Sequence, residues 1–263
     1  MKLIQQGTGD YLVLVHGALA DRFMWLPHIK QLESDFEVVS VSLRHFEGQD
    51  TGGFGLNTHA EDLTQLLQEL PQHKPINLVA WSYGADVVLN ALVNTPLPIA
   101  KIFLYEPGYP GCLQGETLES WQADANSMFG PVFEHVANGH LERAVEALID
   151  ASANKIGYFQ SQSNTVKDLQ LAKAHTLTHQ LNQQENAAIT PTTISEMNAP
   201  IVLGFGLNTR ELFRVVTVKT AQLAPNTEIK EIPGANHMLP QENPRMFSEY
   251  IKTIFSHSAN ATV

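Results

Sequence analysis

Cysteine and basic residues are both scarce in this chain of 263 residues. The single cysteine, Cys112, excludes a disulfide within the chain. Such cysteine usage is typical of a reducing compartment, so we expect a cytoplasmic protein. Lys and Arg number 16 against 27 Asp and Glu, which gives a formal net charge of −11, and no lysine- or arginine-rich run occurs. We therefore expect no nucleic-acid partner, and the acidity is attributed to solubility.

Long apolar runs are also missing. The segment 1–17 has one lysine and then a short apolar run that ends in a His-Gly turn, which is not a secretory signal pattern. No apolar run approaches the ~18 residues of a membrane span, so no membrane partner is expected. Internal repeats and low-complexity tracts are absent. The hydrophobic content of 43% is ordinary for a soluble globular enzyme.

What the chain does contain is a regular alternation of apolar strands and amphipathic helices, which predicts an α/β fold with a mostly parallel sheet. Several strand candidates are continuous apolar runs, as expected where helices cover both faces of a sheet. The predicted strands are 3–5, 11–15, 37–41, 76–80, 100–104, 201–205 and 228–232. The predicted helices are 58–70, the segment that follows Ser82, 211–223 and 244–255.

The segment 108–199 interrupts this alternation. It is rich in Gln, Asn, Ala, Ser and His, has no convincing strand, and shows helical stretches at 141–149 and 166–184. One interpretation is a polar, mobile linker. Apolar residues recur from Phe129 to Leu148, however, and they favour a packed helical insertion between the fourth main strand and the strand at 201–205.

The sequence Ala80-Trp81-Ser82-Tyr83-Gly84 is the most informative motif. It lies between a predicted buried strand and an apolar-periodic helix. A serine on so tight a strand-to-helix turn is pushed outward above the sheet, and the next backbone N–H faces whatever the hydroxyl attacks. Small residues flank the serine because the turning chain leaves no room for large ones.

A serine nucleophile needs a base and an oxyanion site. The base candidate is His237, in a loop after the last strand, at the sheet edge where such sites assemble. Gly17 lets the chain turn sharply after the first main strand, so the N–H groups of Ala18 and Tyr83 are the candidate oxyanion donors. Other histidines fit the role of the base less well: His16 ends a strand in a His-Gly turn, and His175 and His179 are interpreted as part of a solvated helix face.

The ordered motifs HGALAD, AWSYG and GANHMLPQENP resemble those of the α/β-hydrolase family. The resemblance implies a mostly parallel, roughly eight-stranded sheet flanked by helices, with a helical cap inserted after the sixth strand. The cap corresponds to residues 108–199, and the core domain to residues 1–107 and 200–263. The resemblance also implies that Ser82 is the nucleophile, His237 the base, and Ala18 and Tyr83 the oxyanion donors.

Members of the family also carry an acid that orients the histidine, and together with the serine and the histidine it forms a catalytic triad. The sequence departs from the family pattern at this acid. The family's usual aspartate position, after the seventh strand, holds Thr209 here, which cannot carry a charge. A second acid position of the family, at the end of the sixth strand, holds Glu106, which is the favoured candidate. Glu211, or no acid at all, are the alternatives. Asp86, one turn after Ser82, is interpreted first as a favourable charge at a helix N-terminus, and second as a group that tunes the pocket.

These residues predict a serine hydrolase that cleaves a small ester or lactone through an acyl-enzyme on Ser82, with His237 as base and Glu106 as orienting acid. The expected partner is a small-molecule substrate, and neither a metal nor an organic cofactor is implied. Carbon–carbon bond hydrolysis or cofactor-free peroxidation on the same site is an alternative. A non-catalytic ligand-binding protein is another, and the neutral Thr209 favours it. The oligomeric state is not predicted.

Overall fold

The fold is described from a computed structural model that covers residues 1–48, 51–97 and 99–256. Seven strands form one sheet in the order β1-β3-β2-β4-β5-β6-β7. β1 is antiparallel to β3, and all other neighbouring strands are parallel, as predicted. The strands are β1 (Lys2–Gly7), β2 (Asp10–Val15), β3 (Phe36–Ser42), β4 (Ile76–Trp81), β5 (Lys101–Tyr105), β6 (Ile201–Gly206) and β7 (Thr227–Ile232).

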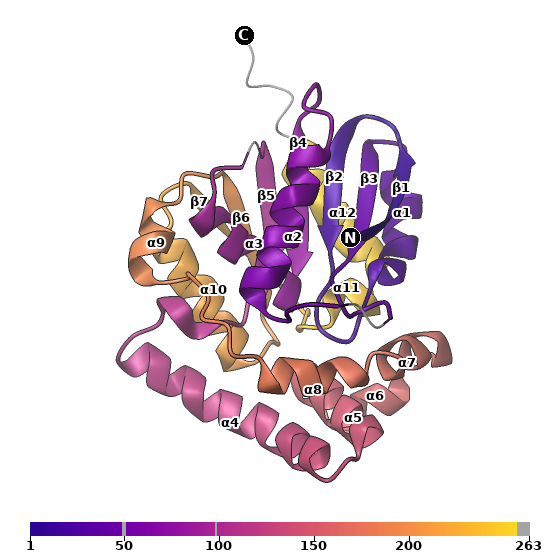
Figure 1. Ribbon diagram of the computed structural model, residues 1–263, viewed down its shortest axis with the longest axis vertical. Coiled ribbons are helices and arrows are strands. Elements are labelled where there is room, and N and C mark those ends of the chain that lie inside the picture. Colours follow the sequence, from indigo (N-terminus) through magenta and orange to yellow (C-terminus); the bar gives the residue numbers. More distant parts are fainter. Residues whose placement is uncertain (49–50, 98, 257–263) are drawn as a thin grey trace.

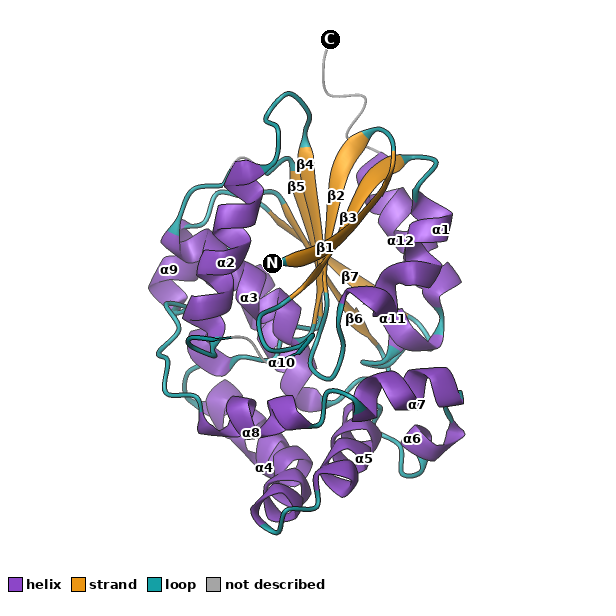
Figure 2. Cartoon of the chain, turned by 45° about the vertical axis from the view of Figure 1, so that its right-hand side comes forward, coloured by secondary structure: helices purple, strands orange, loops and turns teal. Residues whose placement is uncertain are grey.

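Helices cover both faces of the sheet (Figure 2). One face packs on α2 (Leu56–Glu69), α3 (Tyr83–Asn94), α9 (Pro191–Glu196) and α10 (Glu211–Leu223), and the other on α1 (Leu26–Leu32), α11 (Leu239–Glu242) and α12 (Pro244–Ser256). Short 3-10 helices occur at Arg22–Trp25 and Pro110–Cys112. Because the central strands are covered twice, every residue of β4 is buried, and the core forms one apolar cluster on each side of the sheet.

The chain between β5 and β6 is helical, as predicted. It forms α4 (Glu116–Ala137), α5 (Leu141–Ser152), α6 (Tyr158–Ser161), α7 (Asn164–Leu171) and α8 (His175–Asn182), followed by α9. We call α4 to α8 the cap helices, and they lie together beyond one end of the sheet (Figure 1). The helix predicted at 166–184 is divided into α7 and α8, and at the break Lys173 pairs with Asp21.

Two details differ from the family expectation. The described part of the chain contains seven strands rather than about eight, and the cap helices follow β5, the fifth strand in chain order. The boundaries of the predicted cap, 108–199, remain a prediction. The last seven residues of the predicted core range, 257–263, lie outside the described residues.

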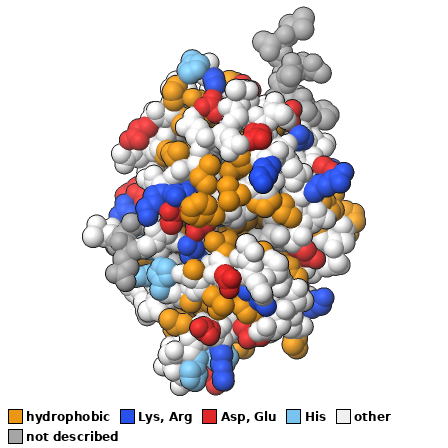
Figure 3. All heavy atoms as spheres, turned by 90° about the vertical axis from the view of Figure 1, so that its right-hand side faces the viewer, with side chains coloured by type: hydrophobic (Ala, Val, Ile, Leu, Met, Phe, Trp, Pro, Cys, Tyr) orange, Lys and Arg blue, Asp and Glu red, His pale blue; other side chains and the backbone are white. Residues whose placement is uncertain are grey.

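The surface carries both signs of charge in spite of the negative net charge. On the face shown in Figure 3, acidic and basic side chains are interspersed with hydrophobic ones. Among the helices of the described ranges, none combines the length and the hydropathy needed to cross a bilayer.

Candidate active site

Ser82 lies on a tight turn between β4 and α3. Its φ of 55° is in the left-handed region, which is strained for a residue other than glycine. The strain is held by close packing, because a Cβ on Gly84 would come within 2.4 Å of the carbonyl oxygen of His16. A Cβ on Gly17 would likewise come within 3.0 Å of the Ser82 Cβ. Gly84 therefore lets the loop after β2 lie directly against the serine turn, and a side chain at position 17 would crowd the same contact.

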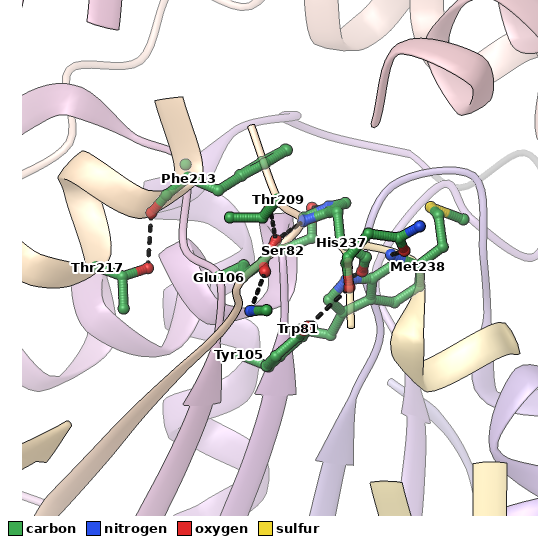
Figure 4. A network of polar contacts seen from close by, with 12 residues as sticks. Trp81, Ser82, Tyr105, Glu106, Thr209, Phe213, Thr217, His237 and Met238 are labelled. Atoms are coloured by element: carbon green, nitrogen blue, oxygen red, sulfur yellow. Dashed lines mark hydrogen bonds and ion pairs between the residues drawn. The ribbon is translucent and has the colours of Figure 1, made fainter. Parts of the chain in front are cut away.

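The predicted catalytic side chains come together in one hydrogen-bonded row (Figure 4). The Ser82 Oγ lies 2.9 Å from Nε2 of His237, and Nδ1 of His237 lies 2.7 Å from Oε2 of Glu106. Glu106 is fully buried, and His237 is 3% exposed. A carboxylate only accepts hydrogen bonds, so Nδ1 is assigned as the donor to Glu106, which leaves Nε2 to accept from the serine hydroxyl. This is the tautomer that a general base requires.

Glu106 is fixed by two further donors. The Gly206 N–H donates to Oε1 at 2.8 Å, and the Thr209 hydroxyl donates to Oε2 at 2.7 Å. Thr209, at the position where the sequence lacked an acid, therefore binds the carboxyl group that comes from β5. Glu211, the other acid considered, instead pairs with Arg214 at 2.6 Å on the surface.

His237 is held on several sides by residues that the sequence did not single out for this task. The Phe213 ring is stacked on the imidazole, with ring centroids 3.6 Å apart. The indole N–H of Trp81 donates to the His237 carbonyl at 2.9 Å, and the Tyr105 hydroxyl donates to the Asn236 carbonyl at 2.7 Å. On sequence alone, such aromatic residues cannot be told from ordinary core residues.

The candidate oxyanion donors, Ala18 and Tyr83, line the same cavity as Ser82. Tyr83 is the first residue of α3, and first-turn amides have no acceptor within their helix. His16 fixes the loop that carries Ala18, because its Nδ1 donates to the Gly17 carbonyl at 2.7 Å and its Nε2 accepts from the Leu43 N–H at 3.0 Å. Burial lowers the pKa of His16 to about 4, so the ring stays neutral and keeps both bonds at neutral pH.

A cavity of about 430 Å³ lies between the row of catalytic side chains and the cap helices. Its size falls within the range of small-molecule sites. On the cap side the wall is mostly apolar, with the polar residues Ser152, Gln180 and Gln183 at its border. The apolar side chains are those of Trp121, Met128, Phe129, Phe133, Leu148, Ile149 and Leu181. No lysine or arginine is found among the described residues that line the cavity.

Asp86 is the carboxyl group of the cavity wall. It lies in the first turn of α3, as expected, and its Oδ1 accepts from the N–H groups of Gly108 and Tyr109 at 2.9 and 3.0 Å. Burial raises the pKa of Asp86 to about 7, and the two amide hydrogen bonds offset only part of this effect. The side chain thus borders the space that a substrate would fill.

Other polar side chains near this end of the sheet, including the two histidines considered from the sequence, have structural partners. Arg44 pairs with Asp62, His175 Nε2 bonds the His45 carbonyl, and the His179 ring stacks on Phe54. Within the described ranges, no group of three or more His, Cys, Asp or Glu side chains could hold a metal ion.

Known proteins resemble this chain in sequence and in fold. Residues 12–249 match the alpha/beta hydrolase family. A relative in Bacillus subtilis strain 168, the uncharacterized hydrolase YugF, is 21% identical over 91% of this chain and 88% of its own. The esterase RhEst1 from Rhodococcus sp. ECU1013 has a similar structure, with a TM-score of 0.77 and 19% identity over 97% of this chain and 94% of its own.

The enol-lactonase from Burkholderia xenovorans LB400 is also similar in structure. Its TM-score is 0.74, with 13% identity over 97% of this chain and 96% of its own. At such low identities, the two structural matches show a shared fold alone.

Proposed function

Because this chain belongs to the α/β-hydrolase family, we propose that it is a serine hydrolase that cleaves a small ester or lactone. The observation that carries the proposal is the row of hydrogen bonds from Ser82 through His237 to Glu106. A serine hydroxyl is a poor nucleophile without such a base, and an imidazole needs a partner to hold its tautomer.

The proposed reaction has two steps. In the first, Ser82 Oγ attacks the substrate carbonyl carbon while Nε2 of His237 takes the hydroxyl proton. The amides of Ala18 and Tyr83 stabilise the negative oxygen of the tetrahedral intermediate. The C–O bond to the leaving group then breaks, and His237 returns the proton to the departing oxygen. In the second step His237 deprotonates a water molecule that attacks the acyl carbon. The bond from that carbon to Ser82 Oγ then breaks, and His237 returns the proton to Oγ, which releases the acid and restores Ser82.

Glu106 acts through His237 in this scheme. Its carboxylate holds the Nδ1 proton and stabilises the imidazolium that forms when Nε2 takes the serine proton. The carboxylate stays in place because Gly206 and Thr209 bind it. We favour an ester or lactone because these substrates need no machinery beyond the groups already described, and because the structurally similar proteins include an esterase and a lactonase.

Labelling with a fluorophosphonate probe tests this proposal. We expect the wild-type protein to label covalently and the Ser82→Ala variant to lose both labelling and at least ~10³-fold of its activity on p-nitrophenyl butyrate. Ser152→Ala is the matched control, because Ser152 also lines the cavity while the hydrogen bond of His237 Nε2 goes to Ser82. That variant should label like the wild type.

The alternatives give different results. A folded wild-type protein that does not label would favour a non-catalytic binding protein. A labelled protein that leaves esters and a lactone intact but cleaves a β-diketone would favour carbon–carbon bond hydrolysis, which the same site can support.

A further inference from the structure

The cavity wall contains one acidic side chain that the proposed mechanism does not use. Asp86 lies one helical turn after Ser82, and its N–H donates to the Ser82 carbonyl at 3.1 Å. Ser82 and Asp86 both line the same cavity of about 430 Å³. A molecule of substrate size that fills this cavity can therefore contact Asp86 while its carbonyl group meets Ser82.

The carboxyl group is nearly removed from water and is only half satisfied. Asp86 is 7% exposed and borders the cavity. Its Oδ1 receives both amide hydrogen bonds, whereas no residue in the described ranges donates to Oδ2. No cation offsets the charge either: the cavity lining lacks lysine and arginine among the described residues. Oδ2 is not fully enclosed by the protein and the side chain lines the cavity, so a molecule bound in the cavity can supply the missing donor.

The side chains around Asp86 are mostly apolar, so its carboxyl group is unusual in this cavity. Most side chains that line the cavity are aliphatic or aromatic, and an apolar residue at position 86 would extend that wall. The raised pKa of Asp86, about 7, has the same cause, since burial opposes ionisation and no nearby cation favours it. A donor supplied by a bound molecule would satisfy Oδ2, and a cationic donor would also favour the ionised carboxylate.

We propose that Asp86 selects substrates that carry a hydrogen-bond donor, a hydroxyl or an ammonium group, a few ångströms from the reacting carbonyl group. This proposal rests on the proposed hydrolase function and adds the class of substrate. The apolar cap wall would hold the hydrocarbon part of such a molecule, while Asp86 would fix its polar end. A site built to bind a donor rejects the analogue that lacks it, because the buried acceptor then stays unpaired.

Binding of three small probes tests the proposal without requiring turnover. Benzylammonium, benzyl alcohol and toluene have similar size, and only the first two carry a donor. Dissociation constants are measured by isothermal titration calorimetry at pH 8 with the intact wild-type protein. We expect at least one of the two donor probes to bind 10-fold or more tightly than toluene, although an apolar cavity alone would favour toluene.

Variants assign the effect to Asp86. In Asp86→Leu, which removes both oxygens at similar volume, the affinity for the donor probes should fall at least 10-fold and toluene should bind most tightly. Asp86→Asn can still accept from the Gly108 and Tyr109 amides through its one oxygen. It should lose affinity for benzylammonium, which only donates, and retain benzyl alcohol, which can also accept. This variant therefore distinguishes an ammonium site from a hydroxyl site.

Glu228→Gln is the control for a general loss of negative charge, because Glu228 is exposed on β7. It should leave all three dissociation constants within about twofold of wild type. The proposal is overturned if toluene binds the wild type most tightly, or if Asp86→Leu keeps the preference for donors. Fluorophosphonate labelling in parallel separates the two proposals, since an unlabelled protein that still prefers donors refutes only the hydrolase function.

Discussion

The two walls of the cavity are built in different ways. The wall at the carboxyl ends of the strands, which we call the floor, carries Ser82, His237 and Glu106 in a continuous row of hydrogen bonds. The opposite wall, the roof, consists of cap helices with apolar side chains such as Phe129 and Leu148. Directional bonds fix atoms for chemistry, whereas apolar contacts set size and shape. Under the proposed function, the floor supplies the reacting groups and the roof limits the size of the substrate.

The roof is attached to the core by a few charged contacts. Lys173, between α7 and α8, pairs with the buried Asp21 at 2.5 Å, and Arg210 binds Asp124 of α4 at 2.5 Å. Glu185, which follows α8, accepts from the N–H groups of Asn57 and Thr58 in the first turn of α2, at 2.7 and 3.1 Å. A carboxylate is favoured at that end of a helix. We therefore expect substitutions in the floor to lower mainly the activity, and substitutions at the contacts of the roof to lower mainly the free energy of unfolding.

The largest effect is expected on the floor, from Glu106→Gln. The amide side chain cannot stabilise an imidazolium and favours the wrong histidine tautomer, so kcat on p-nitrophenyl butyrate should fall by about 10³- to 10⁴-fold. The free energy of unfolding should change much less than the activation free energy, which denaturant titration of the same sample would show. Near-normal turnover would remove Glu106 from the mechanism.

A matched variant tests the neighbour of Glu106. Thr209→Val removes one hydrogen bond to the same oxygen without changing the charge. We expect only a ~10-fold lower kcat, about 1.4 kcal/mol, since Gly206 still holds the carboxylate. A loss of kcat as large as that of Glu106→Gln would mean that Glu106 cannot orient His237 without the hydrogen bond from Thr209.

Lys173→Met is the corresponding disruption of the roof. Asp21 is 1% exposed and would lose its charge partner, so the protein should be destabilised by about 3–5 kcal/mol. Denaturant unfolding measures this change, and the double variant Lys173→Met with Asp21→Asn should recover part of it. Ser82 in the folded fraction should still label with a fluorophosphonate. Loss of labelling in folded protein would contradict the separation of roof and floor.

The smallest expected effect concerns Asp86, at the border of the two walls. Its pKa of about 7 lies above its ordinary value of 3.8, so the native state binds a proton more tightly than the unfolded chain. The stabilisation from protonated Asp86 is complete below about pH 4 and is lost as pH rises through about 7. The pKa values of Tyr83 and Cys112, which interact with Asp86, are also raised, so these groups stay neutral in this range.

Asp86→Asn should remove this pH dependence. Its free energy of unfolding, relative to wild type, should rise between pH 5 and 8 by about 1–3 kcal/mol, with an upper limit of about 1.4 kcal/mol per pH unit. Urea unfolding at pH 5, 6, 7 and 8 measures the difference, and Glu228→Gln is the control, for which a flat difference is expected. An equally flat curve for Asp86→Asn would show that the carboxyl group is not forced towards its protonated form by burial.

Much of the floor could be predicted from sequence because its motifs are local. The turn around Ser82 and the His-Gly turn before Ala18 are each defined by a few neighbouring residues, and the apolar runs before them mark strands. The family resemblance points to Glu106, because that residue occupies the family's second acid position and the usual position holds the neutral Thr209. The sequence could not indicate that Thr209 donates to Glu106, since those residues are 103 positions apart. The stacking of Phe213 on His237 was hidden for the same reason.

The amino-acid sequence by itself determined the order of strands and helices, the glycines at the two tight turns and the family, because periodicity and turn geometry are properties of short segments. Only the tertiary structure decided which acid reaches His237, which surfaces form the roof and which oxygen of Asp86 lacks a donor. Those features depend on contacts between distant segments, and such contacts arise only when the sheet brings the carboxyl ends of its strands to one edge.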